Sequence, residues 1–209
     1  MECWIPEETD SSEFDSWEEY DRFLYSVFKS DFVDSRPIFE GMEVKPRTNP
    51  RFDEREESFW HLTCRDYRHK SGLPESRDPD LDRCRRIRWP RAFIEHHLEC
   101  GYHDIDPGYC SGVVVWRSTH KSKKGKPKER VKLYLKEEQY LLVMEKRNRY
   151  YLLITAYRIT EEWSIRSIER EAAKKGGKNA GSACQALPEG SFAHTVDELH
   201  ELYHLYIAK

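Results

Sequence analysis

The stretch VVVWRSTHKSKKGKPKERVKLYLKEEQYLLVMEKRNRYYLLITAYRI, residues 113–159, decides the fold of this chain. Four short runs in it are rich in β-branched, leucine and aromatic residues and are separated by polar turns: 113–117, 131–135, 140–145 and 150–159. Short strands joined by tight turns pair with their neighbours in antiparallel order. The stretch therefore predicts a four-stranded antiparallel β-meander.

Amphipathic segments flank this meander on both sides. Residues 16–30 place aromatic and aliphatic side chains on one helical face, behind a capping box at their start. A second helix is expected to begin at Pro90, because proline suits the first position of a helix. A third is expected over 161–175, where a glycine pair ends the pattern. These segments predict an α+β protein with helices packed on the sheet.

The remaining segments carry weaker signals. Residues 35–57 contain three prolines and read as an extended connection, 58–63 (SFWHLT) alternates like a short strand, and 65–82 is a charged, turn-rich loop. A second capping box at Thr195 predicts an additional C-terminal helix. The expected organisation is an acidic N-terminal tail (1–15), an α+β domain (16–175), a linker (176–193) and a final helix (194–209).

The composition is that of a folded domain with a heavily charged surface. The chain has 209 residues, of which 35% are charged and 13% are aromatic, and a disordered chain would lack so many aromatics. No segment is apolar enough to span a membrane, and the first residues do not resemble a secretory signal. We therefore expect a cytoplasmic protein with no membrane partner, whose six scattered cysteines are free thiols.

The charges are segregated along the chain. Residues 1–40 hold twelve acidic residues against three basic ones, whereas 117–136 hold nine basic residues against Glu129. Such segregation is typical of proteins that bind a polyanion, although it also suits a solvated loop and helix face. On the first interpretation the RNA-binding residues are Arg65, Lys121, Lys123, Lys124, Lys126, Lys128 and Lys132.

A small set of side chains has the chemistry needed to cut RNA without a metal. A base must take the proton of the 2′-hydroxyl, a cation must stabilise the charge on the phosphorane, and an acid must protonate the leaving oxygen. Histidine suits either proton step, and the planar arginine fork suits the phosphate. The candidates are His61, Arg83, Arg85, Thr155 and Tyr157, and the last two share one face of their strand because they are two residues apart.

The order of several motifs resembles a known group of nucleases. The motifs are a helix with Trp17, Tyr20, Phe28 and Phe32, then SFWHLT (58–63), RCRRIRW (83–89), a basic hairpin, and LLITAY (152–157). Together they are similar to the phage and bacterial nucleases of the barnase–EndoU–colicin–RelE fold group, over roughly residues 16–170.

This resemblance implies a metal-independent endoribonuclease of the toxin or defence type, acting on tRNA or mRNA. It implies that His61 is the general base or acid, that Arg83 and Arg85 bind the phosphate, and that Thr155 and Tyr157 position it. It further implies no cofactor and no catalytic metal, with RNA as substrate and an antitoxin or immunity protein as a possible partner.

Other interpretations of the same residues remain open. His61 is also a good core histidine, and Arg83, Arg85 and Arg86 are well placed to form an ion network with Asp78, Asp80 and Asp82. A zinc site over His97, Cys100, His103 and Cys110 has plausible ligands but an unfamiliar spacing. The whole chain is alternatively a nucleic-acid-binding or protein-interaction module without catalysis, and its acidic N-terminal segment is then a candidate cover for the basic face.

Overall fold

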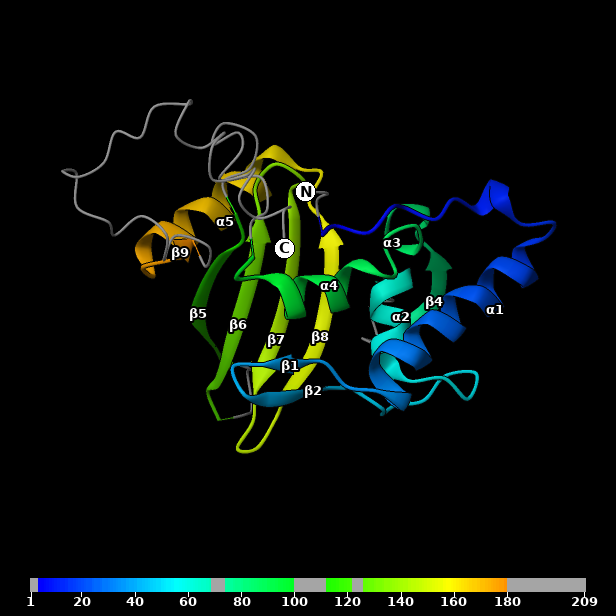
Figure 1. The fold of residues 1–209 in the computed structure, drawn as a ribbon, viewed down its shortest axis with the longest axis horizontal. Coiled ribbons are helices and arrows are strands. Elements are labelled where there is room, and N and C mark those ends of the chain that lie inside the picture. The colour runs from blue at the N-terminus through cyan, green and yellow to red at the C-terminus, as the bar shows by residue number, and fades with distance from the viewer. Residues whose placement is uncertain (1–3, 69–73, 100–111, 122–125, 180–209) are drawn as a thin grey trace, which may run out of the picture.

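A computed structural model describes residues 4–68, 74–99, 112–121 and 126–179 (Figure 1). The architecture is α+β, as the sequence predicts: a curled mixed sheet carries helices on both faces. Helix α4 crosses one face, α5 lies on the other, and α1, α2 and α3 lie to the side of the central strands that β8 borders (Figure 1). No helix in the described ranges is long and apolar enough to cross a membrane.

The four expected strands form the centre of the sheet and pair antiparallel as a meander. They are β5 (Val114–His120), β6 (Lys128–Leu135), β7 (Tyr140–Lys146) and β8 (Tyr151–Arg158). The prediction that they are the whole sheet is wrong, because the described chain gives seven strands in the order β1-β2-β8-β7-β6-β5-β9.

The additional strands come from segments with weak sequence signals. Strand β2 (Met42–Pro46) pairs parallel to β8 and makes the sheet mixed, and β1 (Ile38–Phe39) pairs with β2. Strand β9 (Lys178–Asn179) pairs with β5 at the opposite edge. In β2 the central Val44 is fully buried while its neighbours are half-buried, and Pro46 ends the strand. So short a pattern does not separate a strand from an extended connection.

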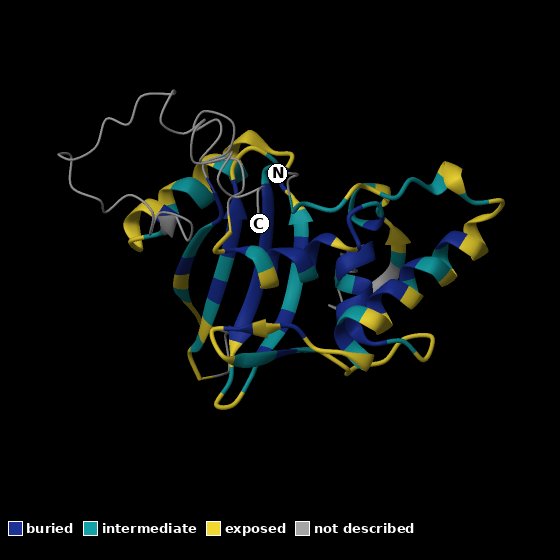
Figure 2. Cartoon of the chain, viewed as in Figure 1, coloured by how far each residue is buried: buried dark blue, intermediate teal, exposed yellow. Residues whose placement is uncertain are grey.

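Alternation along the strands gives the sheet two apolar faces. On β6, Val131 and Leu133 are fully buried in the larger core, to which α1, α2 and α4 also contribute buried side chains. The opposite face carries Trp116 and Tyr134, against which α5 packs Ala172. Figure 2 shows buried residues concentrated on the central strands and on the helix sides turned toward them.

The predicted helices are present where the pattern placed them. Helix α1 (Trp17–Phe28) begins after Ser16, whose hydroxyl accepts the amide of Glu19, and it continues as a π-helical turn, η2 (Lys29–Asp34). Helix α4 (Trp89–His96) starts with proline in its first turn, and α5 (Glu162–Lys174) ends before Gly176. Two further short helical elements are the 3₁₀ turn η1 (Ser11–Glu13) and helix α3 (Leu81–Cys84). The expected C-terminal helix lies outside the described residues.

The strand predicted over 58–63 is wrong, because this segment is helix α2 (Glu57–Thr63). The loop predicted over 65–82 is largely an antiparallel hairpin of β3 (Cys64–Arg68) and β4 (Pro74–Pro79). Tertiary contacts override the weak alternation: six of the seven residues of α2 are buried, and its Ser58 and Trp60 are tied to other segments by hydrogen bonds.

Ser58 fixes α2 to the sheet, so its hydroxyl predicts a measurable stability effect. The Ser58 hydroxyl donates to the carbonyl of Leu153 at 2.9 Å, accepts the amide of Arg47 at 2.7 Å, and is fully buried. We expect Ser58→Ala to lower the free energy of unfolding by about 1–3 kcal/mol, because two backbone groups lose their hydrogen bond to a fully buried hydroxyl. The control is Ser26→Ala on exposed α1 surface; equal losses in urea unfolding of the two variants would contradict this role.

The acidic N-terminal segment lies against the helices from residue 4 onward. The Tyr20 hydroxyl donates to the carbonyl of Thr9, and the Trp89 indole donates to the carbonyl of Pro6, each at 2.9 Å. Trp4 packs edge-on against Phe93. Residues 4–9 are therefore held on α1 and α4 by apolar and hydrogen-bonding contacts.

Candidate functional site

Helix α2 presents His61 beside an acidic residue one turn earlier. The Nε2 atom of His61 lies 3.3 Å from Oε1 of Glu57, and the imidazole is about one-fifth exposed. Residues four apart on a helix lie on the same face, so the helix itself places the carboxylate against the ring. A carboxylate in this position fixes the orientation of an imidazole and stabilises its protonated form.

Glu57 is itself held by a buried arginine. Its Oε2 atom accepts a hydrogen bond from Nη2 of Arg77 at 2.6 Å, and both side chains are less than one-tenth exposed. The Arg77 guanidinium lies over the rings of Phe52 and Trp60, at 5.1 and 5.5 Å from their centroids. Glu57 thus carries two contacts at once, one to a permanent cation and one to His61.

Two of the predicted catalytic residues meet at the backbone of His61. Nη1 of Arg83 donates to the His61 carbonyl at 2.8 Å, and the Thr155 hydroxyl donates to the same oxygen at 3.1 Å. These bonds join α2, α3 and β8 across sequence separations of 22 and 94 residues. They position the end of α2 and therefore the imidazole that it carries.

Arg83 also links His61 to the other predicted residues. Its guanidinium lies over the ring of Tyr157, 5.0 Å from the centroid, and its Nε lies 3.4 Å from Oδ2 of Asp80. Arg65 donates to that same Asp80 oxygen at 2.6 Å, and its side chain is more than half exposed. We call the group formed by His61, Arg65, Arg83, Thr155 and Tyr157, with the acids Glu57 and Asp80, the His61 cluster.

Arg85 is not part of this cluster. It lies near the acidic N-terminal segment, with guanidinium nitrogens 3.6 Å from Glu8 and 3.5 Å from Asp10. Arg86 beside it pairs with Glu8 and, at 2.6 Å, with Asp82. The predicted role of Arg85 beside Arg83 therefore has no geometric support, because α3 turns the two side chains toward different partners. The alternative of an ion network with the aspartates applies to Arg83 and Arg86.

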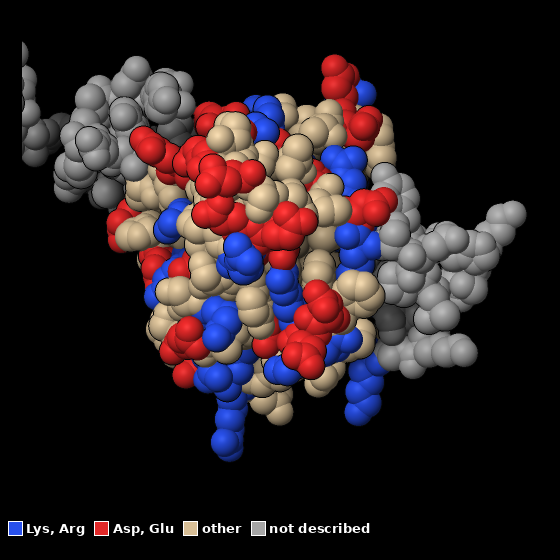
Figure 3. Space-filling view, turned by 90° about the vertical axis from the view of Figure 1, so that its right-hand side faces the viewer, with Lys and Arg blue, Asp and Glu red and all other residues tan. Residues whose placement is uncertain are grey.

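Two of the predicted RNA-binding lysines pair with acidic side chains in the described part of the chain. Lys128 pairs with Glu145, and Lys132 pairs with Glu171 at 2.5 Å on the face covered by α5. Lys121 and Lys126 are exposed at the ends of the β5–β6 connection, whereas Lys123 and Lys124 lie outside the described residues. The face that bears α1, on the side of the molecule away from β5 and β6, shows acidic and basic side chains side by side (Figures 1 and 3).

Sequence reasoning missed the acids of the cluster. Glu57 and His61 stand four residues apart, which places them in contact on one face of a helix. In a strand they would lie about 13 Å apart, and the predicted strand began only at residue 58. Assigning these residues to a helix would have placed the Glu57 carboxylate beside the His61 ring. Asp80 was considered only as a surface partner, although its side chain is 8% exposed.

The alternative zinc site is not supported by the described part of the chain. Cys100, His103 and Cys110 lie outside it, and within it no group of three histidine, cysteine or acidic side chains is arranged to hold a metal ion. The remaining candidate, His97, is buried: its Nδ1 lies 2.9 Å from the carbonyl oxygen of Ile94, and its ring lies 4.7 Å from that of Phe39.

Burial of His97 predicts a pH-dependent stability. Burial lowers the pKa of this imidazole, so the unfolded chain binds a proton at a higher pH than the folded one. The free energy of unfolding should fall as pH decreases from about 6.5 through the lowered folded pKa, and His97→Gln should remove this part of the loss. Urea unfolding at pH 7.5 and 5.5 measures the loss of unfolding free energy between the two pH values, and His96→Gln is the control. If His97→Gln loses as much stability as the wild type between these pH values, His97 is not the cause of the loss.

No protein-family model matches the chain, and neither a curated protein nor a solved structure matches it significantly.

Proposed function

We propose that this protein is a metal-independent endoribonuclease whose reaction centre is the His61 cluster. The observation that carries the proposal is convergence: residues from α2, β3, α3 and β8, chosen for their chemistry, lie within one group of contacts around His61. His61 offers an imidazole for proton transfer, Arg65 an exposed guanidinium for charge stabilisation, and Tyr157 a phenol for positioning, the three requirements of RNA cleavage without a metal. The contacts that join them run through Asp80, Arg83 and the His61 carbonyl.

The reaction would proceed through the RNA's own 2′-hydroxyl. His61 accepts the proton of that hydroxyl as its oxygen attacks the adjacent phosphorus. The P–O5′ bond then breaks, and a protonated group returns a proton to the leaving oxygen. The products are one strand with a 2′,3′-cyclic phosphate and one with a 5′-hydroxyl. No electrons are transferred to or from an outside reagent.

The contacts support different tasks for the predicted residues. Arg65 is the most exposed cation of the cluster and is the best candidate to bind the phosphate. Arg83 and Thr155 are positioning residues, because their donor groups already bind the His61 carbonyl. Glu57 orients the imidazole and stabilises its protonated form.

A binding module without catalysis is the second candidate, and one observation favours it. Arg83 already donates to the His61 carbonyl. Asp80 lies against both Arg65 and Arg83 and neutralises part of their charge. Such a site would bind RNA through Arg65 and leave the strand intact.

A comparison of RNA with DNA separates the two candidates. The full chain is incubated in EDTA with a labelled RNA and with DNA of the same sequence. The ribonuclease cuts only the RNA, because DNA lacks the attacking hydroxyl. The binding module retards both on a gel, weakens with added salt, and cuts neither. Cleavage of the DNA as well as the RNA would contradict attack by the 2′-hydroxyl.

A further inference from the structure

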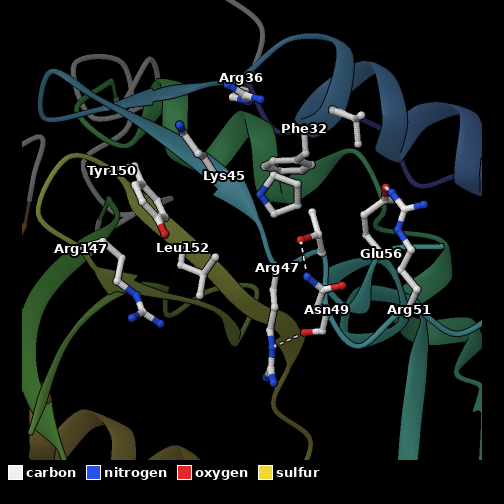
Figure 4. A pocket seen from close by; sticks show the side chains of 13 residues that line it. Phe32, Arg36, Lys45, Arg47, Asn49, Arg51, Glu56, Arg147, Tyr150 and Leu152 are labelled. Carbon is white, nitrogen blue, oxygen red and sulfur yellow. Dashed lines mark hydrogen bonds and ion pairs between the residues drawn. The ribbon is translucent and has the colours of Figure 1, made fainter. Parts of the chain in front are cut away.

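A second concave site lies apart from the His61 cluster. A cavity of about 510 Å³ opens between η2, β2, the segment that follows β2, and the turn from β7 to β8 (Figure 4). We call it the β2–β8 pocket. Its volume is in the range of pockets that hold small ligands. None of the described residues that line it belongs to the His61 cluster.

The pocket is strongly cationic. Five of its lining side chains are basic, and they come from four different places in the chain: Arg36, Lys45, Arg47, Arg51 and Arg147. Glu56 is the one carboxylate among the described lining residues, and it pairs with Arg51 at 3.4 Å while accepting a hydrogen bond from the Tyr25 hydroxyl. A cavity whose rim carries several cations and, among the described lining residues, one carboxylate attracts an anionic ligand.

The contacts of these cations leave charge available to a ligand. Arg36 and Lys45 share a single carboxylate, Glu43, at 3.3 and 3.2 Å, and all three side chains are more than one-third exposed. Arg147 pairs with Glu145, which Lys128 also contacts. The contacts of Arg36 and Lys45 with Glu43 are solvent-exposed, and such pairs contribute little to stability and can exchange partners when a stronger anion arrives. Arg147 is held more firmly, because its partner Glu145 is buried.

Arg47 is the best-prepared cation of the pocket. Its backbone amide and carbonyl are fixed to Ser58 on α2, and its Nε donates to the carbonyl of Asn49 at 2.9 Å. Within the described chain it has no carboxylate partner. The one Nε bond orients the guanidinium and leaves its terminal nitrogens for an acceptor (Figure 4). A planar fork held in this way suits a phosphate group.

The pocket also has an apolar and aromatic side. Leu152 and Phe32 contribute aliphatic and aromatic surface, and the half-buried ring of Tyr150 stands on the same wall as Arg147 (Figure 4). Lys45 lies over the Tyr150 ring, 5.1 Å from its centroid. A phosphate alone would use only the cationic rim. Aromatic rings stack on nucleic-acid bases, so a ligand with both a base and a phosphate would use the whole pocket.

We propose that the β2–β8 pocket binds a nucleotide phosphate, with the phosphate on Arg47 and its cationic neighbours and the base against Tyr150. The same chemistry is offered by a free mononucleotide and by the terminal nucleotide of a 5′-phosphorylated strand. The inference does not depend on cleavage at His61, because it rests on other residues.

Calorimetric titration of the full chain tests the pocket with four probes. These are adenosine 5′-monophosphate, adenosine, inorganic phosphate, and a 5′-phosphorylated DNA tetramer that a ribonuclease using the 2′-hydroxyl cannot cut. The mononucleotide should bind more tightly than adenosine or phosphate, because only it reaches both halves of the pocket. Absence of mononucleotide binding by the folded protein would overturn the proposal.

Three variants locate the binding. Arg47→Ala should weaken mononucleotide binding about tenfold or more, the effect of losing a charge-assisted hydrogen bond. Tyr150→Ala should weaken it by at least about fivefold and leave phosphate binding unchanged. The matched control is Arg149→Ala, which removes an exposed cation from the same turn but not from the pocket lining. Equal losses of mononucleotide affinity in Arg47→Ala and Arg149→Ala would show that binding depends on the overall positive charge of the surface, and would refute the site.

The tetramer identifies the source of the ligand. Affinity at least tenfold tighter than that of the mononucleotide, lost in Arg47→Ala, supports a strand end. Equal or weaker affinity supports the free nucleotide. If the tetramer binds more tightly but Arg47→Ala has no effect on any probe, the binding lies elsewhere and the proposal fails.

Discussion

His61→Ala should lower the rate of RNA cleavage by about 10²–10⁴-fold while leaving the protein folded. The rate falls because a positioned acid–base group contributes that factor to a proton-transfer reaction. The fold survives because the imidazole is partly exposed, Glu57 keeps its contact with Arg77, and the Arg83 and Thr155 bonds go to the His61 backbone, which alanine retains.

The control for this variant is His96→Ala. His96 is an exposed histidine paired with Glu99, so its loss removes a histidine and an ion pair without touching the His61 cluster. Initial rates on one defined RNA, with thermal unfolding of each variant, give the comparison. Equal rates in wild type and His61→Ala would remove His61 from the reaction, and equal losses in both variants would show an effect unrelated to the cluster.

Glu57→Ala should lower the free energy of unfolding by about 3–5 kcal/mol, the cost of breaking a buried ion pair from one side. Arg77 is 5% exposed, and the carboxylate that it binds at 2.6 Å would be gone. Its guanidinium would then remain between Phe52 and Trp60 with its charge uncompensated. Urea unfolding measures the loss.

Two further variants show whether pairing causes that loss. The double variant Glu57→Leu with Arg77→Met should recover most of the stability, because apolar groups of similar size replace a buried pair at little net cost. Arg166→Ala, which breaks the exposed pair of Arg166 with Glu162 on α5, should cost less than about 1 kcal/mol. A Glu57→Ala effect as small as that of Arg166→Ala would contradict the importance of the buried pair.

The meander could be predicted from sequence because its local signals agree. Each central strand carries alternating buried residues, as Val131 and Leu133 do on β6, and polar turns separate the strands. Strand β2 could not be predicted this way. Its pairing with β8 joins Val44 to Tyr151 across more than one hundred residues, and nothing in a five-residue segment ending in proline reports that contact.

The candidate site was predicted in part for a related reason. His61, Arg83, Thr155 and Tyr157 were selected by chemistry and motif order, and the fold brings them together although they come from three elements. The chemistry of a side chain does not report its direction, so Arg85 was grouped with Arg83 although it faces the N-terminal segment. Correct secondary structure for α2 was the missing step in finding Glu57.

The most direct test of the proposed reaction is the chemistry of the new strand ends. A defined RNA is incubated with the full chain in EDTA, beside the His61→Ala variant, and the fragments are weighed by mass spectrometry. Attack by the 2′-hydroxyl predicts 5′-hydroxyl ends with 2′,3′-cyclic phosphates or their hydrolysed phosphates, formed by the wild type and strongly reduced in the variant. Intact RNA, or fragments with 5′-phosphate and 3′-hydroxyl ends, would contradict a metal-independent ribonuclease centred on His61.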